Sequence, residues 1–214
     1  MPALVVAVKQ TAGRGQQNRT WWSGPGSLTF TLAIENLDRD APGLVAIASA
    51  IAVCKTISAF APNIEPQVKW PNDVLVDGKK ISGVLIESIA LSRSITLVGI
   101  GVNTNCSLAD AEVELQAIAS SLKDLTGSDV DQQQFLIQLV NELNTWIYER
   151  QTKGVIGSFM NVSKFNAGDP ICVKSSRFGI LTGQFVGINA VAELIVSVDG
   201  KSLAIASGSI VDPD

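Results

Sequence analysis

Residues 69–87 read KWPNDVLVDGKKISGVLIE, and this stretch decides how the rest of the 214-residue chain is interpreted. Residues 74–76 and 81–89 have the apolar character of strands. The Asp77-Gly78 pair between them is typical of a two-residue hairpin turn, because glycine accepts the positive φ that such a turn needs. The stretch therefore predicts a β-hairpin inside a largely buried sheet.

The polar residues of this hairpin indicate a ligand site. Lys80 enters a strand that is otherwise apolar, where an ammonium group is costly unless an anion lies beside it. Asp73, Glu87 or a bound phosphate could supply that anion, and a solvated lysine beside the turn is the alternative. Asn72 and Asp73 follow Pro71 and have short side chains that suit a polar ligand or a metal ion.

The composition limits the chemistry available to the chain. It is 46% hydrophobic and 17% charged, as in ordinary globular proteins, and its net charge of −4 predicts no nucleic-acid partner. The sequence contains no histidine, which excludes histidine-dependent triads and histidine acid–base catalysis within this chain. Positioning and charge stabilisation of phosphates fit the residue types that remain.

Cysteine spacing and hydropathy predict a cytoplasmic protein. Cys54, Cys106 and Cys172 form neither a metal-ligand spacing nor a disulfide framework, which fits a reducing compartment. We expect no membrane association and no signal peptide, on the reading that no apolar stretch reaches the roughly 18 residues that a span needs.

The start of the chain predicts two strands separated by a loop. Residues 4–9 (LVVAVK) predict a buried strand, and residues 27–34 (SLTFTLAI) alternate with period two, as in a strand with one face toward water or a ligand. Residues 10–25 (QTAGRGQQNRTWWSGP) place Arg14 between two glycines, so that the backbone can approach a ligand closely. A disordered surface loop is the alternative, and Trp21 and Trp22 argue against it.

The middle of the chain predicts helices that pack on a sheet. Residues 42–60 predict a buried helix, and residues 94–105 (SITLVGIGVNTN) predict a strand whose glycines mark a close approach of a ligand or of another backbone. Asn103 and Asn105 end this strand with amides that can read the edge of a purine. Further helices are expected over residues 115–125, from the cap residue Asp131 to Tyr148, and over residues 155–161.

The pattern changes near Asn166, where short β-like runs alternate with Gly and Asp turns. Four or five short strands in under fifty residues predict a small β-barrel or SH3-like module. We therefore expect an α+β protein with two domains. Residues 1–165 would form a mixed central sheet flanked by helices, and residues 166–214 would form the β module.

Four features in order resemble the biotin protein ligase family. They are the TAGRG-x-x-x-R-x-W loop at residues 11–21, KWPND followed by KISG, VGIGVNTN at residues 98–105, and the C-terminal β module. The resemblance runs from about Val5 to the end of the chain. It implies a class II synthetase-like catalytic domain with a C-terminal SH3-like barrel. It also implies ATP-dependent activation of biotin to biotinyl-5′-AMP, with Mg²⁺, and transfer to a lysine of a biotin carboxyl carrier domain.

The resemblance also implies a role for each matching residue. Lys80 and Arg14 would be catalytic, and Asp73 would contact Mg²⁺. The residues implied for biotin are Gln10, Gly13, Arg14, Gly15, Gln16, Lys80 and Gly83. The residues implied for the nucleotide are Arg19, Trp21, Asn72, Asp73 and Asn103.

The sequence departs from the family pattern in two places. Gln16 and Asn18 replace a commonly basic residue and a glycine of the loop, which predicts weaker retention of the adenylate. The family's Ser/Thr-Asn segment has no counterpart before residues 4–9, so we expect either that this sequence starts late relative to the family or that the enzyme is impaired. We expect no DNA-binding domain before the first strand, so that a repressor role is not implied.

Two other functions stay open on the sequence alone. The first is acyl transfer by a lipoate or octanoate ligase, and the second is a non-catalytic module that binds biotin or the adenylate. The KWPND and KISG pairing favours biotin over lipoate. A homodimer through sheet edges is compatible with the resemblance.

Overall fold

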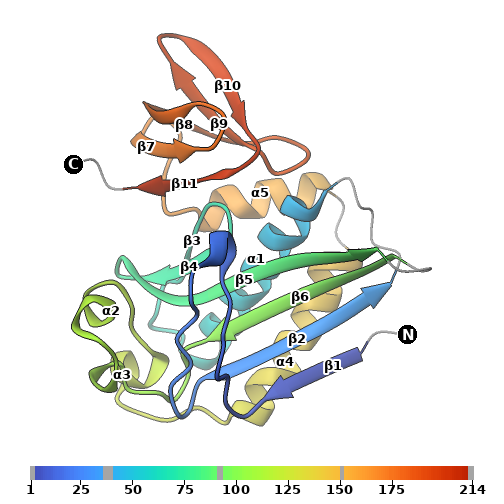
Figure 1. Cartoon of the computed structure of the whole chain (residues 1–214), viewed down its shortest axis with the longest axis vertical. Helices are drawn as coiled ribbons and strands as arrows, with labels where there is room; N and C mark the ends of the chain where they lie inside the picture. Colours follow the sequence, from blue (N-terminus) through green and yellow to red (C-terminus); the bar gives the residue numbers. More distant parts are fainter. Residues whose placement is uncertain (1–2, 36–40, 91–93, 150–151, 212–214) are drawn as a thin grey trace.

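The computed structural model of the chain describes residues 3–35, 41–90, 94–149 and 152–211. These ranges form an α+β protein with a six-stranded sheet, helices on one of its faces, and a separate five-stranded sheet beyond one end (Figure 1). The expected α+β class is confirmed. The central sheet is antiparallel at every strand pair of the described chain, so the expectation of a mixed sheet was wrong.

The central sheet has the strand order β1-β2-β6-β5-β4-β3. Its long strands in the middle carry alternating apolar residues, and the side chains of one face pack on the helices. The strands are β1 (Ala3–Ala7), β2 (Leu28–Glu35), β3 (Gln67–Lys69), β4 (Asp73–Val76), β5 (Lys79–Ala90) and β6 (Ser94–Val102).

Strand β1 lies at the edge of this sheet and pairs only with β2 within the described residues. Its side chains are exposed, with 66% of Val5 and 47% of Val6 accessible to solvent. The prediction over residues 4–9 was therefore correct about a strand but wrong about its burial, because the strand is exposed. An apolar run indicates a strand, but it does not tell a central strand from an edge strand.

The hairpin between β4 and β5 is confirmed. Asp77 and Gly78 have φ values of 50° and 76°, the positive pair that a type I′ turn requires. The pairing of β4 with β5 shifts by one residue between Val74 and Leu75: Val74 pairs with Ser82, whereas Leu75 pairs with Lys80. The bulge leaves one extra residue on β5 and brings Lys80 to the same face as Gly83.

Helix α1 (Pro42–Phe60) crosses the covered face of the sheet and forms the centre of the core. Proline at its first turn is compatible with helix initiation, because the first N–H groups have no helical acceptor. The helix is long and apolar enough to cross a membrane, which corrects the expectation that no such stretch exists. In the structure 61% of the apolar segment is buried, as expected for a core helix.

The remaining helices are α2 (Val113–Ile118), α3 (Leu122–Thr126), α4 (Gln132–Asn144), the π-helical turn η3 (Thr145–Glu149) and α5 (Thr152–Val162). Helices α4 and α5 and the turn η3 pack against α1, whereas α2 lies against β5. The helix expected over residues 115–125 is two helices, separated at Ala119, whose backbone pairs with Lys80 as an isolated bridge. Asp131 caps the long helix as expected, because its carboxylate accepts hydrogen bonds from two backbone N–H groups of the first turn.

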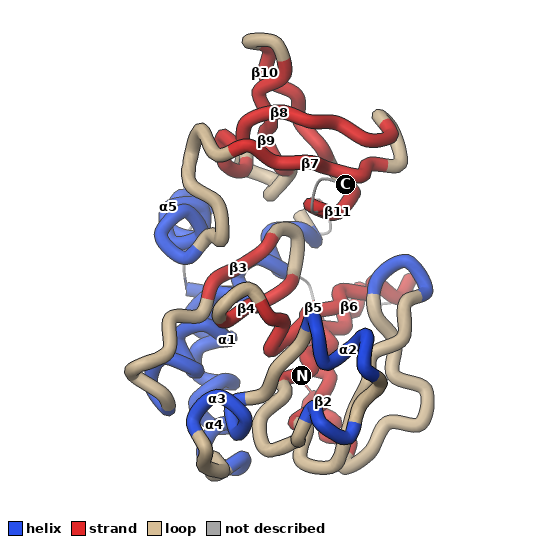
Figure 2. Tube along the Cα trace, turned by 90° about the vertical axis from the view of Figure 1, so that its left-hand side faces the viewer, coloured by secondary structure: helices blue, strands red, loops and turns tan. Residues whose placement is uncertain are grey.

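The second sheet has five antiparallel strands in the order β10-β9-β8-β7-β11. It lies beyond α5 at one end of the central sheet (Figure 2). The indole Nε1 of Trp70 donates a 2.9 Å hydrogen bond to the Ala192 carbonyl, which joins the two parts. The strands are β7 (Pro170–Ser175), β8 (Gly179–Ile188), β9 (Leu194–Val198), β10 (Lys201–Ile205) and β11 (Gly208–Val211).

Candidate active site

The candidate site lies on the face of the central sheet opposite the helices, where the segment between β1 and β2 crosses the sheet (Figure 1). Strand register places one row of residues side by side beneath this segment, since Asp73 pairs with Gly83, Gly83 with Gly101, and Gly101 with Thr29. Two glycines in the middle of this row leave the backbone of β5 and β6 open to close contact.

The crossing segment folds back on itself as a small hairpin. The N–H of Trp21 donates to the Gly13 carbonyl at 2.9 Å, and the N–H of Gly15 donates to the Arg19 carbonyl at 2.7 Å. A side chain at Gly13 would overlap the Trp21 carbonyl, so the close approach of the two backbones requires glycine there. The segment expected to be a flexible loop is thus an ordered hairpin, which we call the glycine–arginine loop (residues 10–21).

Lys80 reaches the site from the start of β5, and its anion is Asp73. The lysine Nζ lies 2.5 Å from the Asp73 carboxylate, and the side chains are 33% and 28% exposed. The same Nζ lies 5.6 Å from the centre of the Trp21 ring. Of the three anions considered from the sequence, the structure places Asp73 beside this lysine.

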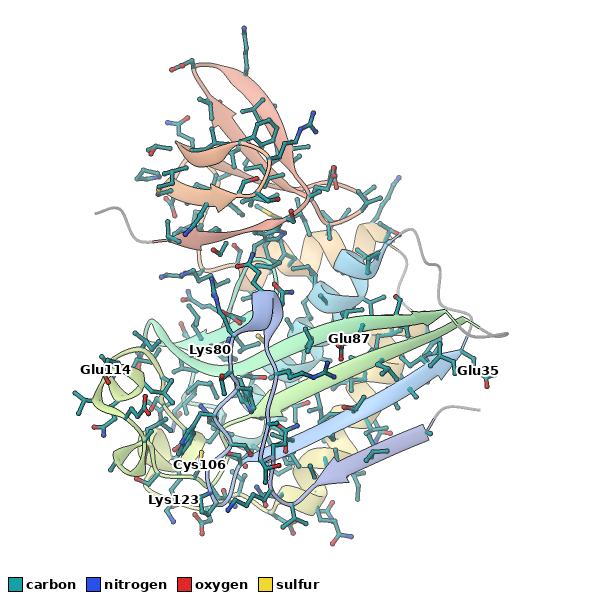
Figure 3. All side chains as sticks on the ribbon, in the orientation of Figure 1. Glu35, Lys80, Glu87, Cys106, Glu114 and Lys123 are labelled. Atoms are coloured by element: carbon teal, nitrogen blue, oxygen red, sulfur yellow. The ribbon has the colours of Figure 1, made fainter. Side chains whose placement is uncertain are left out.

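Arg14 of the glycine–arginine loop pairs with Glu87 of β5. The guanidinium Nη2 lies 3.1 Å from the carboxylate, and 72% of the arginine side chain is exposed. Figure 3 shows Glu87 on the same face of the sheet as Lys80, further along β5. Glu87 therefore joins the loop to the sheet, a role that its sequence position alone did not indicate.

A cavity of about 870 Å³ opens beside this ion pair. The glycine–arginine loop forms one wall, and the start of α1 and the Trp70-Pro71 corner form others. The turn between β10 and β11 contributes Ala206, Ser207 and Gly208. No sequence signal marked this turn, because nothing local indicates that the second sheet reaches the first.

The other predicted loop residues lie at or near the cavity. Gln16 and Gly15 line it, and the Arg19 guanidinium, which also lines it, donates a 3.4 Å hydrogen bond to Gln17. The Gln10 side chain lies next to Gly13, where its Oε1 would be 2.9 Å from an added Cβ. The structure thus brings the predicted loop residues to one side of the sheet.

The asparagines predicted for the nucleotide take part in hydrogen bonds with the backbone. The Asn72 amide donates to the Val84 carbonyl at 2.5 Å, and the Asn103 amide donates to the Ser120 carbonyl at 3.0 Å. The Oδ1 of Asn103 is buried and is among the few side-chain atoms of the described residues without a hydrogen-bond partner. That oxygen is the group of Asn103 that could accept a bond from a ligand.

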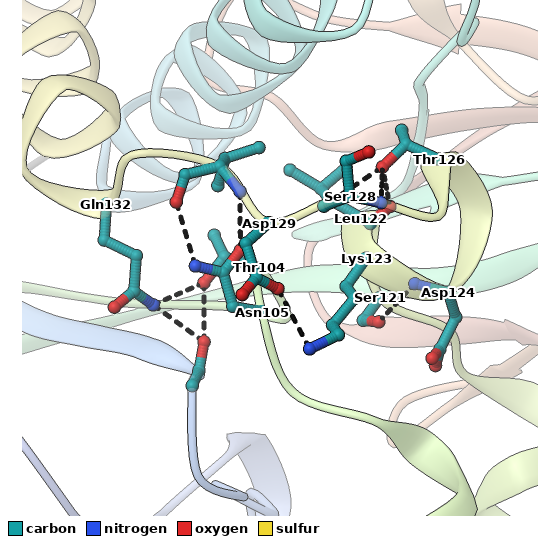
Figure 4. Close-up of polar contacts among 12 residues, drawn as sticks. Thr104, Asn105, Ser121, Leu122, Lys123, Asp124, Thr126, Ser128, Asp129 and Gln132 are labelled. Atoms are coloured by element: carbon teal, nitrogen blue, oxygen red, sulfur yellow. Dashed lines mark hydrogen bonds and ion pairs between the residues drawn. The ribbon is translucent and has the colours of Figure 1, made fainter.

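Asn105 has a structural role instead. Its amide nitrogen donates to the Val130 carbonyl at 2.9 Å, and its oxygen accepts from the Val130 N–H at 2.8 Å. Figure 4 shows this pair beside the Gln132–Thr104 hydrogen bond, which is 2.7 Å long. Asn105 therefore fastens the end of β6 to the start of α4, and the expectation that it reads a purine was wrong.

The three cysteines take no part in this chemistry. All are free and buried. Burial raises the pKa of the Cys54 thiol to about 12 and also raises the pKa of Cys106. The thiolate is the nucleophilic form, so the thiols of Cys54 and Cys106 are unreactive near neutral pH.

A divalent cation would depend on the nucleotide for most of its ligands. Among the described residues, no group of three or more Asp, Glu, Cys or His side chains is placed to hold a metal ion. Asp73 offers one carboxylate at the site. Mg²⁺ is commonly bound by one or two carboxylates together with substrate phosphates, so the residues present fit an ion that arrives with ATP.

Known proteins resemble this chain in sequence and in fold. Residues 1–105 match the Biotin/lipoate A/B protein ligase family. The two sheet glycines, the arginine-bearing loop and Lys80 all lie within these residues. Over 97% of its length the chain is 25% identical to the biotin–[acetyl-CoA-carboxylase] ligase of Mycobacterium tuberculosis and covers 78% of that protein. The chain is thus similar to a biotin–[acetyl-CoA-carboxylase] ligase along almost its whole length.

Two further matches define how much of each relative is shared. The solved biotin protein ligase from Aquifex aeolicus in complex with biotin and ATP has a TM-score of 0.84 and 26% identity, covering 97% of this chain and 87% of that one. The bifunctional ligase/repressor BirA of Bacillus spizizenii is 41% identical over 60% of this chain. The chain spans 40% of the length of that repressor.

Proposed function

We propose that the chain activates biotin with ATP to form biotinyl-5′-AMP and then transfers biotin to a lysine of a biotin carboxyl carrier domain. The observation that carries this proposal is the Lys80–Asp73 pair beside the two sheet glycines, under a loop that bears Arg14. The solved relatives include a complex with biotin and ATP and another with biotinyl-5-AMP.

In the first step a biotin carboxylate oxygen attacks the α-phosphorus of ATP, and the bond to pyrophosphate breaks. Negative charge on the α-phosphate oxygens grows in the transition state, and Lys80 is the cation placed to stabilise it. Asp73 aligns this lysine before the nucleotide arrives. When bound, Mg²⁺ neutralises phosphate charge, and Asp73 is the residue that would contact it.

In the second step the amine of the carrier lysine attacks the acyl carbon of the mixed anhydride, AMP leaves, and the amine loses its proton to water. The anhydride would hydrolyse if water reached it freely. The glycine–arginine loop crosses the sheet above the reacting groups and restricts that access. Arg14 would exchange its contact with Glu87 for the phosphate, since both are oxyanions.

The substrate class is tested by pyrophosphate release from the purified chain with ATP, Mg²⁺ and either biotin or lipoate. We expect release with biotin and none with lipoate. Release with lipoate alone would assign the chain to lipoate chemistry, which the biotin/lipoate family also contains. Biotin binding without pyrophosphate release would instead support a non-catalytic binding module.

The acceptor is tested separately with a biotin carboxyl carrier domain. We expect mass spectrometry to show one added biotin on the wild-type domain. A control domain with its acceptor lysine changed to arginine should stay unmodified. Formation of the adenylate with no transfer to the wild-type domain would contradict the proposed partner.

A further inference from the structure

The side chain of Trp21 lies on the sheet where the proposed function needs room for biotin. A Cβ added at Gly101 would overlap the indole ring, and a Cβ at Gly83 would lie 3.5 Å from it. Gly83 and Gly101 are direct neighbours across β5 and β6. The indole therefore rests on the glycine pair itself, with the Lys80 ammonium 5.6 Å from its ring centre.

The open space of the site lies elsewhere. The 870 Å³ cavity is lined by the glycine–arginine loop, Glu87 and the turn at Ala206. Among the described residues that line it, none belongs to the Gly83–Gly101 pair, and Lys80 is also absent. A ligand that reaches Lys80 along the sheet would have to enter the space that Trp21 fills.

The contact of Trp21 with the sheet is incomplete in one respect. Its indole Nε1 is buried, and within the described part of the chain it has no hydrogen-bond partner. A buried unpaired donor opposes the conformation in which it occurs, because the donor has given up its hydrogen bond to water. The indole ring of Trp21 therefore fills the space over the glycine pair, but its own N–H is left without a hydrogen bond.

The neighbouring tryptophan has different surroundings. Trp22 packs against a small buried cluster of Cys106, Leu108 and Ala119, away from the two glycines. The chain can therefore keep its anchor at Trp22 while the side chain before it rotates. The Arg14–Glu87 pair is largely exposed and offers little resistance to a shift of the loop.

We propose that Trp21 occupies the biotin pocket of the unliganded chain and leaves the glycine pair when biotin binds, so that it controls access to Lys80. The proposal rests on the proposed function, because it takes biotin as the entering ligand. The fused rings of biotin would replace the indole over Gly83 and Gly101. Binding then follows ring opening, and the closed form lowers the apparent affinity by the fraction that is open.

Tryptophan emission tests the movement. We expect biotin to change the emission and the acrylamide quenching of the wild-type chain, and we expect this change to be lost in Trp21→Phe. Trp22→Phe is the matched control and should keep it. An unaltered biotin response in Trp21→Phe would overturn the proposal, because some other tryptophan would then report binding.

Binding kinetics test the control of access. The observed rate of biotin binding should level off with concentration in the wild-type chain, where ring opening becomes limiting. In Trp21→Ala it should stay linear and be at least ~10-fold faster, as expected if the open form is populated at 10% or less. An unchanged association rate in Trp21→Ala would show that Trp21 is a fixed wall of the pocket.

A pair of glycine variants tests the contact without biotin. Gly101→Ala should expel the indole and raise acrylamide quenching of the unliganded chain. Gly99→Ala is the control on the same face of β6, because its Cβ would meet Leu85 at an ordinary 3.5 Å. Equal quenching in both variants would contradict the proposed position of Trp21.

Calorimetry of biotin binding distinguishes a failure of this inference from a failure of the proposed function. Absence of biotin binding by the wild-type chain would overturn the proposed function and this inference together. Biotin binding with no change at Trp21 would overturn the inference alone and leave the ligase function in place.

Discussion

At the scale of single residues, the site is built from charges that already have partners. Lys80 has Asp73, and Arg14 has Glu87. Each partner carboxylate occupies a position near which a substrate oxyanion is expected. The Lys80–Asp73 pair is about two-thirds buried, so water screens it less than the exposed Arg14–Glu87 pair.

Lys80 is expected to act in the transition state. Lys80→Ala should lower biotin-dependent pyrophosphate release by ~100-fold or more, the usual cost of losing one group that stabilises developing charge. Circular dichroism should show an unchanged fold, because the lysine is at the edge of the core. Lys79→Ala is the matched control: its ammonium points to the Gln116 carbonyl, and full activity is expected. Equal losses in both variants would refute the assigned role.

Cys54 gives a pH-dependent prediction. Its thiol pKa is about 12 in the fold against 9.0 in the unfolded chain, because burial disfavours the thiolate. The stabilisation by the neutral thiol is complete below pH 9 and is lost as the pH rises toward 12. The free energy of unfolding of the wild-type chain should therefore fall toward that of Cys54→Ala by up to ~1.4 kcal/mol per pH unit in this window. Urea titrations at several pH values measure the gap, and a constant gap would contradict the prediction.

At the scale of elements, local patterns determined what could be predicted. The β4–β5 hairpin follows from two adjacent turn residues, and the Asp131 cap follows from one side chain and two N–H groups of the first helical turn. The edge position of β1 depends on a partner more than twenty residues away, which no local pattern encodes. The division between α2 and α3 arises where Ala119 pairs with β5, another long-range contact.

The site shows the same limit. The residue types around Lys80 were predictable, but the choice of Asp73 as its partner depends on the bulge that shifts the β4–β5 register. The contact of Trp21 with Gly101 and the arrival of Ser207 at the cavity each join distant parts of the chain. Sequence patterns indicate which groups a site contains, whereas their pairing depends on register and packing.

The hairpin turn provides a test of backbone strain. Gly78 has φ +76° and open space around it, so Gly78→Ala should destabilise the fold by ~1 kcal/mol through the left-handed conformation alone. Gly157 in α5 also has open space but no positive φ. Gly157→Ala should stabilise the helix by roughly 0.5–1 kcal/mol. Urea denaturation measures both, and effects of the same sign would refute the explanation from φ.

At the scale of the whole molecule, two sheets share one core and one cavity. The main hydrophobic cluster contains buried residues of both sheets, including Val84 of β5 and Val196 of β9. The Trp70–Ala192 hydrogen bond lies beside this contact, with Trp70 only 3% exposed. The KWPND motif thus serves the site through Asn72 and Asp73 and the assembly of the two sheets through Trp70.

Trp70→Phe tests this connection. Loss of the indole donor leaves the buried Ala192 carbonyl unpaired, which should cost ~1–3 kcal/mol. Hydrogen exchange should become faster in β7–β11 in particular. Trp146→Phe is the control, because that indole donates to Glu142 within the neighbouring helix. Equal acceleration of exchange in the second sheet by both variants would show that the Trp70 bond does not connect the sheets.

The wall that Ala206, Ser207 and Gly208 contribute has a consequence for synthesis. Translation produces Arg14 and Glu87, which line the same cavity, more than a hundred residues before that wall. A nascent chain still short of Gly208 holds the charged groups with one side of their cavity open to water. The cavity is therefore closed on this side only after the ribosome has released the last strands. A product that terminates before Ala206 would carry the KWPND motif but would lack this wall of the cavity.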